Sequence, residues 1–325
     1  MIILWNLVEL KRFPDGADGQ GLMKSILISE TRPSMTKEQG RIKIDTPSVY
    51  ILSSEELRRL QLVLLEMLIE LDSLCKKHNI RYCIIAGTLL GAVRHEGFIP
   101  WDDDLDVAMT RDEYERFRET CKTELDAEKY FFQDNTTDPH YPWGYGRLRR
   151  IGSEFVRIGQ EHLKMRTGIF LDVFPIDNVP DFSPIRGLFT AYCFLLRKIL
   201  YSRVGAVSEK SMVKRAIYRL LLSIPLGWVF KRLDRLHGCG RGRNTKYARI
   251  LTFPTPGGRL YGYFRKWYTD VSTIKFEGRA FSCVREWDEY LTYKFGDYMA
   301  LPPPEQRHWH PVSHFNLPEG ENVKE

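Results

Sequence analysis

The chain has 325 residues, of which 43% are hydrophobic and 28% are charged. A chain of this length and composition can bury a full hydrophobic core, and we expect one elaborated globular unit. Its formal net charge of +6 is compatible with phosphate-bearing ligands or an anionic membrane surface. The basic excess is too small to indicate nucleic acid, so nucleic acid is not an expected partner.

The cysteines and the start of the chain bear on its compartment. Six cysteines are scattered without a C-x-x-C pair, which favours neither a zinc site nor a disulfide framework. The opening MIILWNLVELKRF is apolar but lacks the basic region and the cleavage site of a signal peptide. We therefore predict a reducing, cytoplasmic location. Residues 1–50 are predicted to be a loosely packed N-terminal extension, because most of this segment shows no clear periodicity.

The first strongly periodic segment starts at Ser53. Glu56 follows three residues later, which completes a capping box, and apolar residues then recur at helical spacing from Leu57 to Leu71. This pattern predicts an amphipathic helix. The run RYCIIAG (81–87) then predicts a short strand ended by a glycine turn, and TLLGAVRH (88–95) resumes helical spacing.

The turn at Gly87 is a candidate phosphate site. A helix entered from Gly87 presents unpaired backbone N–H groups and the positive end of its dipole, with the Thr88 hydroxyl beside them. Gly87 and Thr88 are therefore predicted to bind phosphate. The alternative is that Gly87 and Gly91 merely allow the helix to pack closely.

Four carboxylates follow within WDDDLDVAM (101–109). Side chains alternate along a strand, so Asp104 and Asp106 are expected on one side while Leu105 and Val107 point into the core. Carboxylates this close repel one another unless cations bind between them, and hard oxygen ligands suit Mg²⁺. The sequence predicts a divalent metal site for Mg²⁺, with Mn²⁺ as the alternative ion.

Two other interpretations of the acidic cluster were weighed. A fully solvated turn is disfavoured by the apolar residues that flank it. A calcium loop would place Asp102, Asp104, Asp106 and Glu113 at positions 1, 3, 5 and 12 of an EF-hand. The sixth position of that loop requires glycine for a sharp turn, but the residue there is Val107, which argues against an EF-hand.

A third carboxylate is available in GIFLDVFPID (168–177). This run predicts a strand that contains Asp172 and stops at Pro175. An acidic residue inside such an apolar run requires a partner or a metal. Asp172 is therefore the first choice to join Asp104 and Asp106 as a metal ligand and catalytic carboxylate, and Asp177 is the second choice.

Several basic residues are candidates for binding the phosphate or other parts of the substrate. Arg94 and His95 follow the glycine turn along the predicted helix, and Arg147 and Arg149 alternate in GYGRLRR so that both can face one site. His310, near the C-terminus, is a further candidate. Each of these side chains also has a structural interpretation as a surface or packed residue. Arg147 is the favoured member of the group.

The middle of the chain holds two apolar stretches, residues 187–205 and 216–236, which are interrupted by Arg and Lys. Neither has the roughly 18 uncharged apolar residues that a membrane-spanning helix needs, so we predict helices that do not cross a bilayer. Two interpretations stay open. The helices pack on the catalytic sheet as a subdomain, or residues 187–236 make peripheral contact with a membrane.

The stretch AGTLLGAVRHEGFIPWDDDLDVAMTRDEYERF (86–117) resembles the LicD family, whose members include bacterial phosphocholine transferases and the fukutin-like transferases of eukaryotes. The likeness continues through YGRLRR (145–150), GIFLDVFPID and, near the end, FEGRAFSCVREWDEYLTYKFGDYMALPPPEQR (276–307). By motif it covers roughly residues 55–180 and 262–312.

The resemblance implies an α+β fold with a nucleotidyltransferase-like mixed sheet core, flanked by helices and carrying a helical insertion. We expect the catalytic core in residues 51–182, the helical insertion in 183–250, and the part that completes the LicD-like domain in 251–325. By motif matching, Asp104 and Asp106 become the paired metal ligands and Asp172 the third acidic residue. Asp102 and Asp103 would shape the loop or support these ligands.

The activity implied by the resemblance is Mg²⁺-dependent transfer of a phosphorylated alcohol, phosphocholine or an alditol phosphate, from a CDP-linked donor. The acceptor would be a hydroxyl of a cell-surface glycan, such as lipopolysaccharide, or of its lipid-linked precursor. Two alternatives stay open. A nucleotidyltransferase would instead transfer a nucleoside monophosphate, and a binding or scaffold protein would retain the fold without catalysis.

Overall fold

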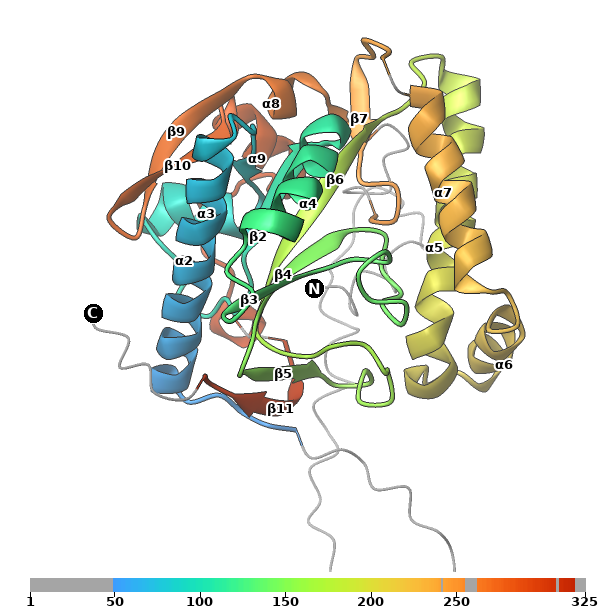
Figure 1. The fold of residues 1–325 in the computed structure, drawn as a ribbon, viewed down its shortest axis with the longest axis horizontal. Coiled ribbons are helices and arrows are strands. Elements are labelled where there is room, and N and C mark those ends of the chain that lie inside the picture. The colour runs from blue at the N-terminus through green and yellow to red at the C-terminus, as the bar shows by residue number, and fades with distance from the viewer. Residues whose placement is uncertain (1–48, 241, 255–261, 308–309, 319–325) are drawn as a thin grey trace, which may run out of the picture. The chain divides into compact units, whose positions relative to one another are not determined.

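A mixed β-sheet forms the centre of the fold (Figure 1). The computed structural model describes residues 49–240, 242–254, 262–307 and 310–318, which belong to the unit formed by Ser48–Glu325. The strands of the sheet are β1 (Cys83–Ile84), β2 (Asp106–Thr110), β3 (Tyr130–Gln133), β4 (Gly146–Arg150), β6 (Phe170–Asn178), β7 (Tyr247–Arg249), β8 (Tyr263–Phe264), β9 (Val271–Phe276) and β10 (Arg279–Val284).

These strands lie in the order β3-β4-β6-β2-β1-β10-β9, with β7 paired to β6 and β8 paired to β7. The pairs β2–β6 and β1–β10 are parallel, and the other pairs are antiparallel. The predicted α+β class with a mixed sheet is therefore confirmed.

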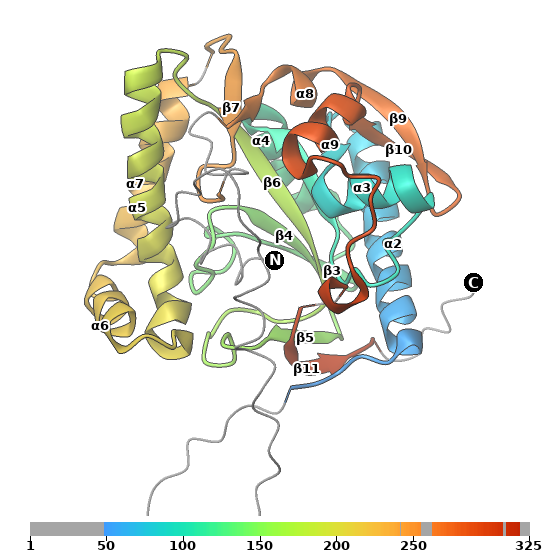
Figure 2. The same cartoon turned by 180° about the vertical axis from the view of Figure 1, so that it is seen from behind.

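Helices cover both faces of the sheet (Figures 1 and 2). One face carries α2 (Ser54–Lys77) and α4 (Arg111–Glu124), and the other carries α3 (Ala86–His95) and α9 (Trp287–Phe295), with the short α8 (Lys266–Thr269) nearby. Helix α2 begins at the predicted capping box of Ser53 and Glu56. All of its predicted core positions are buried: Leu57, Leu60, Val63, Leu64, Met67, Leu68 and Leu71.

Two details of the central strands differ from the sequence-based prediction. Strand β2 begins at Asp106, so Asp104 lies in the loop before it, where its carboxylate meets side chains from outside the sheet. Strand β6 does not stop at Pro175 but continues to Asn178. Its pairing with β4 ends at Val173 and its pairing with β7 begins at Asp177, so the missing N–H of Pro175 falls between the two partners.

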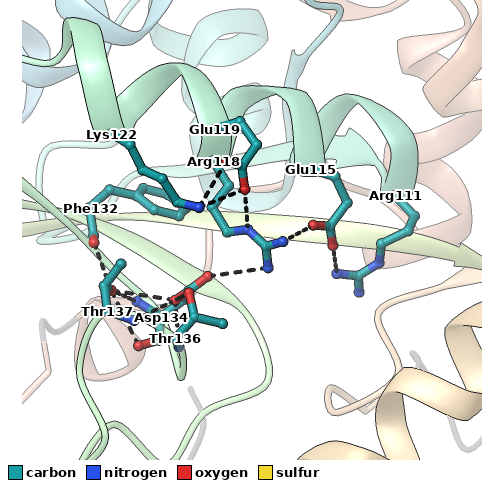
Figure 3. Close-up of polar contacts among 9 residues, drawn as sticks. All are labelled: Arg111, Glu115, Arg118, Glu119, Lys122, Phe132, Asp134, Thr136 and Thr137. Atoms are coloured by element: carbon teal, nitrogen blue, oxygen red, sulfur yellow. Dashed lines mark hydrogen bonds and ion pairs between the residues drawn. The ribbon is translucent and has the colours of Figure 1, made fainter.

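Ion pairs tie α4 to the loop after β3 (Figure 3). Arg118 pairs with Glu115 on the same helix and lies 3.8 Å from Asp134 Oδ2. Asp134 Oδ1 in turn accepts hydrogen bonds from the N–H groups of Thr136 and Thr137. The residues of this network on α4 are Arg111, Glu115, Arg118, Glu119 and Lys122. The network holds α4 in place directly after β2.

Helices α5 (Ser183–Ser208), α6 (Met212–Leu221) and α7 (Leu226–Gly240) form a layer beside the sheet (Figures 1 and 2). They have a small apolar core of their own, which includes Cys193, Leu196 and Leu233. No helix in the described ranges is long and apolar enough to cross a membrane. The segment limits predicted at residues 50, 182 and 250 stay a prediction.

A second, two-stranded sheet pairs β5 (Glu154–Arg157) with β11 (Val312–Asn316). The 3₁₀-helix η2 (Pro304–Gln306) precedes β11. This small sheet carries the C-terminal segment back to the loop that precedes β2. The five cysteines whose side chains are described, Cys75, Cys83, Cys121, Cys193 and Cys283, are buried and unbridged.

Asp177, the second choice for the third carboxylate, belongs to a buried ion cluster. Its carboxylate pairs with Arg111 at 2.7 Å and with His237 Nδ1 at 2.9 Å. Burial opposes its charge, but Arg111 and His237 outweigh burial and lower the pKa of Asp177 to about 2. The structure gives this residue a role in joining α4, β6 and α7.

We expect Asp177→Asn to reduce the free energy of unfolding by about 3 kcal/mol at pH 7, because it leaves the largely buried Arg111 without its carboxylate partner. Because folding lowers the pKa of Asp177, its charged carboxylate stabilises the folded state at pH values above about 4, its pKa in the unfolded chain. This stabilisation disappears as the pH falls towards 2, its pKa in the folded protein. Urea denaturation at several pH values should therefore show wild type and variant converging in acid. The exposed Asp297→Asn is the control, and equal stability of Asp177→Asn and wild type at pH 7 would contradict the argument.

Candidate active site

Asp106 and Asp172 are partners in the register of two adjacent parallel strands, β2 and β6. Partner residues of neighbouring strands place their side chains on the same face of a sheet. The ladder is continued at Leu105, whose carbonyl accepts a hydrogen bond of 2.9 Å from the Asp172 N–H. The backbone thus fixes two carboxylates side by side on the face covered by α3 and α9.

The start of α3 lies beside Asp106. The Asp106 N–H donates to the Thr88 hydroxyl at 2.9 Å, so Thr88 holds the first residue of β2. A Cβ on Gly87 would lie 2.8 Å from Asp102 Oδ2, so the absence of a side chain at Gly87 lets the Asp102 carboxyl approach the start of the helix. Phosphate binding by Gly87 and Thr88 stays a prediction, and Asp102 is the acidic group that the structure places there.

The loop before β2 meets the C-terminal segment. Asp103 is buried and accepts from the His310 backbone N–H at 3.1 Å, and its other oxygen lies 2.7 Å from His310 Nδ1. Asp104 Oδ2 accepts from Arg157 Nη2 at 3.3 Å and lies 3.7 Å from His310 Nδ1. Strands β5 and β11 therefore bring a guanidinium and an imidazole to the predicted carboxylates.

The carboxylates of the loop and of β2 differ in their preference for the proton. Burial opposes the charge of Asp104, but His310 and Arg157 outweigh it and lower the pKa of Asp104. Burial and the neighbouring carboxylates hold the pKa of Asp102 well above its usual range, and a hydrogen bond joins Asp102 to Asp104.

Asp106 has the opposite environment from Asp104. Burial, then Asp104 and Asp172, raise the pKa of Asp106 well above its usual value. In the part of the chain that the structure describes, no hydrogen bond or ion pair engages the Asp106 carboxylate. Asp106 therefore lies beside two other carboxylates, Asp104 and Asp172, without an ion-pair partner of its own.

Arg147 and Arg149 lie on β4, the strand on the other side of β6. Arg147 is the register partner of Asp172, and its Nε donates to Asp172 Oδ1 at 2.6 Å in a buried ion pair. Arg149 is also buried, but it donates to Gln133 at 2.7 Å and to the Gly168 carbonyl at 2.6 Å. Arg147 thus reaches the carboxylates, while Arg149 is bound to other parts of the protein.

Arg94 and His95 lie in the last turn of α3, at the end away from Asp106. Arg94 donates to the Tyr298 carbonyl at 3.1 Å and to His95 Nε2 at 3.0 Å, and the His95 ring packs edge-on against Trp101. The contacts of both residues are thus with the C-terminal loop and the nearby indole. Their predicted role in phosphate binding stays a prediction.

A small pocket of about 20 Å³ lies between Asp106 and the C-terminal helices. Its wall is largely aromatic, with the rings of Phe174, Phe253, Tyr263, Tyr268 and Tyr290. Lys294 of α9 also lines it, donates to the Tyr263 hydroxyl at 3.3 Å, and partly offsets the raised pKa of Asp106.

Arg157 and Lys294 were not predicted from the sequence. Arg157 ends the run EFVR and Lys294 lies in YLTYKF, and neither segment carries a motif that distinguishes these cations from surface residues. The alternating pattern of EFVR is typical of a strand, but nothing in it shows that the strand passes Asp104. Their approach to the acidic residues depends on tertiary contacts alone.

The sequence around these carboxylates is similar to that of known proteins. Residues 79–194 match the family model described as LicD/FKTN/FKRP, nucleotidyltransferase domain. The chain is 29% identical over 271 residues to the lipopolysaccharide cholinephosphotransferase LicD of Haemophilus influenzae, an alignment that spans 79% of this chain and 96% of that protein. The chain is thus similar to LicD family proteins, in the matched nucleotidyltransferase domain and along most of its length.

Two further relatives match over short stretches. An uncharacterised protein of Rickettsia typhi is 45% identical over 58 residues, which is 18% of this chain and 19% of that protein. An uncharacterised protein of Rickettsia prowazekii is 48% identical over 52 residues, which is 16% of this chain and 20% of that protein. The matched family domain includes Asp104, Asp106 and Asp172.

We expect Asp106→Asn to raise the unfolding temperature of the protein in a chelator at pH 7. Because the folded state raises the pKa of Asp106, ionisation of this group opposes folding. Below the unfolded pKa of about 4, Asp106 is protonated in both states and its full contribution to the free energy of unfolding is present. That contribution is lost as the pH rises and the buried carboxyl has to ionise. Calorimetry should therefore show the advantage of the variant shrinking towards pH 4.

Mg²⁺ should raise the unfolding temperature of the wild type more than that of Asp106→Asn, because a bound cation relieves the repulsion. Asp297→Asn, an exposed substitution, should behave like wild type in both conditions. A variant that unfolds at a lower temperature than wild type in the chelator would show that Asp106 has a favourable partner after all.

Proposed function

We propose that this protein transfers a phosphorylated alcohol, phosphocholine or an alditol phosphate, from a CDP-linked donor to a hydroxyl of a cell-surface glycan or its lipid-linked precursor. The similarity to LicD family proteins supports the class of transferases of phosphorus-containing groups. The observation that carries the proposal is the fixed pair of Asp106 and Asp172 beside an aromatic pocket. The relative in Haemophilus influenzae, which aligns over most of both chains, supports phosphocholine and lipopolysaccharide as first candidates.

The residues fit a divalent cation. The Asp106 carboxylate has a raised pKa and no cation partner among the described residues, which is the environment that a bound cation would correct. Asp104, Asp106 and Asp172 would hold Mg²⁺ or Mn²⁺, and the ion would neutralise the negative charge of the donor phosphates. A different set of described residues, Asp103, Asp104 and His310, has possible ligand atoms that all lie within 4.8 Å of one another.

The reaction consists of one displacement at phosphorus. The acceptor hydroxyl oxygen forms a bond to the phosphorus that bears the alcohol, the bond from that phosphorus to the bridging oxygen breaks, and CMP leaves with the bonding electrons. The hydroxyl proton passes to a carboxylate. Arg147 donates to Asp172, whereas the Asp106 carboxylate accepts no hydrogen bond from a described residue, so Asp106 is the candidate to take this proton.

The aromatic pocket bears on how the donor would bind. Most of its rings are buried and pack on one another, as Tyr263 does on Tyr290 at 5.8 Å between centroids, so a base would have to displace them to stack. The Lys294 ammonium that also lines the pocket can bind a phosphate oxygen. Lys294 has no carboxylate partner within the described ranges, so its charge is available to an anion. Arg157, paired with Asp104, supplies a second cation at the opposite side of the carboxylates.

We expect ³¹P NMR of the purified protein with Mg²⁺, a crude glycan acceptor and a panel of CDP-choline, CDP-glycerol, CDP-ribitol, CTP and UTP to show CMP release and a new phosphodiester. Asp106→Asn should reduce the rate by about 10³-fold, since it removes a charged group that acts on the reacting atoms. Asp297→Asn is the matched control and should retain the wild-type rate. Pyrophosphate release from CTP or UTP would point to a nucleotidyltransferase, and a folded protein that turns over no donor would favour a scaffold.

Lys294→Met should raise the KM for the CDP-linked donor by about 10- to 100-fold, the loss expected for a hydrogen bond to a charged phosphate. Lys294→Arg retains the charge and should recover most of the affinity. Steady-state kinetics with varied donor concentration measures both effects, and Lys164→Met, at an exposed lysine, is the control. An unchanged donor KM in Lys294→Met would remove Lys294 from the donor site.

A further inference from the structure

The helical layer carries most of the large apolar side chains that are exposed in the described part of the chain. Residues 182–228 contain twelve of the eighteen such residues. The densest group is on α6, where the exposed fraction is 82% for Met212, 72% for Val213, 53% for Ile217 and 74% for Leu220. We define these four residues as the α6 face.

The α6 face is one continuous surface of the helix. At about 100° per residue, its four members fall within an arc of roughly 140°. The opposite side of α6 holds the buried Tyr218, whose ring packs against Tyr201 of α5 at 5.4 Å between centroids. Helix α6 is therefore fixed to α5 through Tyr218, with its apolar side turned outward at the outer end of the layer (Figures 1 and 2).

Positive charge surrounds the α6 face. Residues 209–235 contain seven Lys and Arg but only two Asp and Glu. Lys210, Lys214 and Arg219 form no ion pair with any residue that the structure describes. Arg215 donates to the Glu209 carbonyl at 2.9 and 2.7 Å, which leaves its charge without a carboxylate.

We propose that the α6 face docks on the surface of an anionic phospholipid bilayer. A helix with exposed apolar residues on one side and basic residues beside them lies in the interface of such a membrane, with its apolar side among the acyl chains and its cations at the lipid phosphates. The face is a convex helix surface rather than a groove, which suits a fluid bilayer. Its purpose rests on the proposed function, because a lipid-linked acceptor would lie in the same membrane.

The test is co-sedimentation of the full chain with vesicles of phosphatidylcholine alone and of phosphatidylcholine with 30% phosphatidylglycerol. We expect binding to the anionic vesicles only, and less binding at high salt. The double variant Ile217→Gln/Leu220→Gln should bind at least about tenfold more weakly, because it removes two side chains from the acyl region. Lys214→Glu/Arg219→Glu should lose a similar factor through charge.

Met299→Gln/Leu301→Gln is the matched control, since these side chains are exposed to 55% and 52% but lie outside the helical layer. It should bind as wild type does. Absence of vesicle binding by the wild type would overturn the docking proposal, and so would equal binding by the α6 variants. A wild-type dimer that becomes monomeric in Ile217→Gln/Leu220→Gln, without vesicle binding, would assign the face to a second copy instead.

The ³¹P assay with a water-soluble acceptor separates this proposal from the proposed function. Vesicle binding without phosphotransfer would support docking and count against the reaction. Phosphotransfer without vesicle binding would overturn docking and leave the reaction standing. The α6 variants should retain wild-type rates on the soluble acceptor, because none of their residues contacts the candidate active site.

Discussion

The register of β2 against β6 is the constraint on which the rest of the site depends. It places Asp106 opposite Asp172, and the next pairing places Arg147 of β4 opposite Asp172 on the far side. Three adjacent strands thus present two negative charges and one positive charge in a row. Because backbone hydrogen bonds hold the row, the repulsion between the carboxylates must be relieved by neighbouring cations or by protonation, and the raised pKa of Asp106 reflects this.

The side chains of Asp103 and Asp104 are engaged by residues of β5 and of the segment just before β11. Asp103 holds His310 by its backbone N–H and its ring, and Asp104 pairs with Arg157. Arg157 ends β5 and His310 lies just before β11, the strand that pairs with β5. The small sheet therefore completes the site, while no ion pair engages the Asp106 carboxylate within the described residues.

The parts of the site that the sequence predicts are those fixed by local pattern. The capping box starts α2 where expected, and Asp172 was identified because a charge in a buried strand needs a partner, which Arg147 supplies. Arg157 and Lys294 could not be found in this way. Each lies far along the chain from the acidic motif, and its approach depends on how β5 and α9 pack, which hydrophobic periodicity does not encode.

The continuation of β6 past Pro175 shows a related limit of sequence reasoning. A proline predicts the end of a strand because it cannot donate to the ladder, yet β6 exchanges one neighbour for another at that point and needs no donor there. The extension has a consequence for the site. It carries Asp177 to Arg111 of α4 and His237 of α7, only five residues beyond Asp172.

The cluster of Asp177, Arg111 and His237 also relates the helical layer to the chemistry. Strand β6 is buried from Phe170 to Asp177 and is paired along its length, so it transmits position with little bending. Helix α7 is attached to this strand near its end through His237, and α5 and α6 pack beside it. The face of α6 and the carboxylate of Asp172 are therefore parts of one framework. Under the docking proposal, a bilayer that binds the α6 face would hold this framework, and with it Asp172, at the membrane where a lipid-linked acceptor would lie.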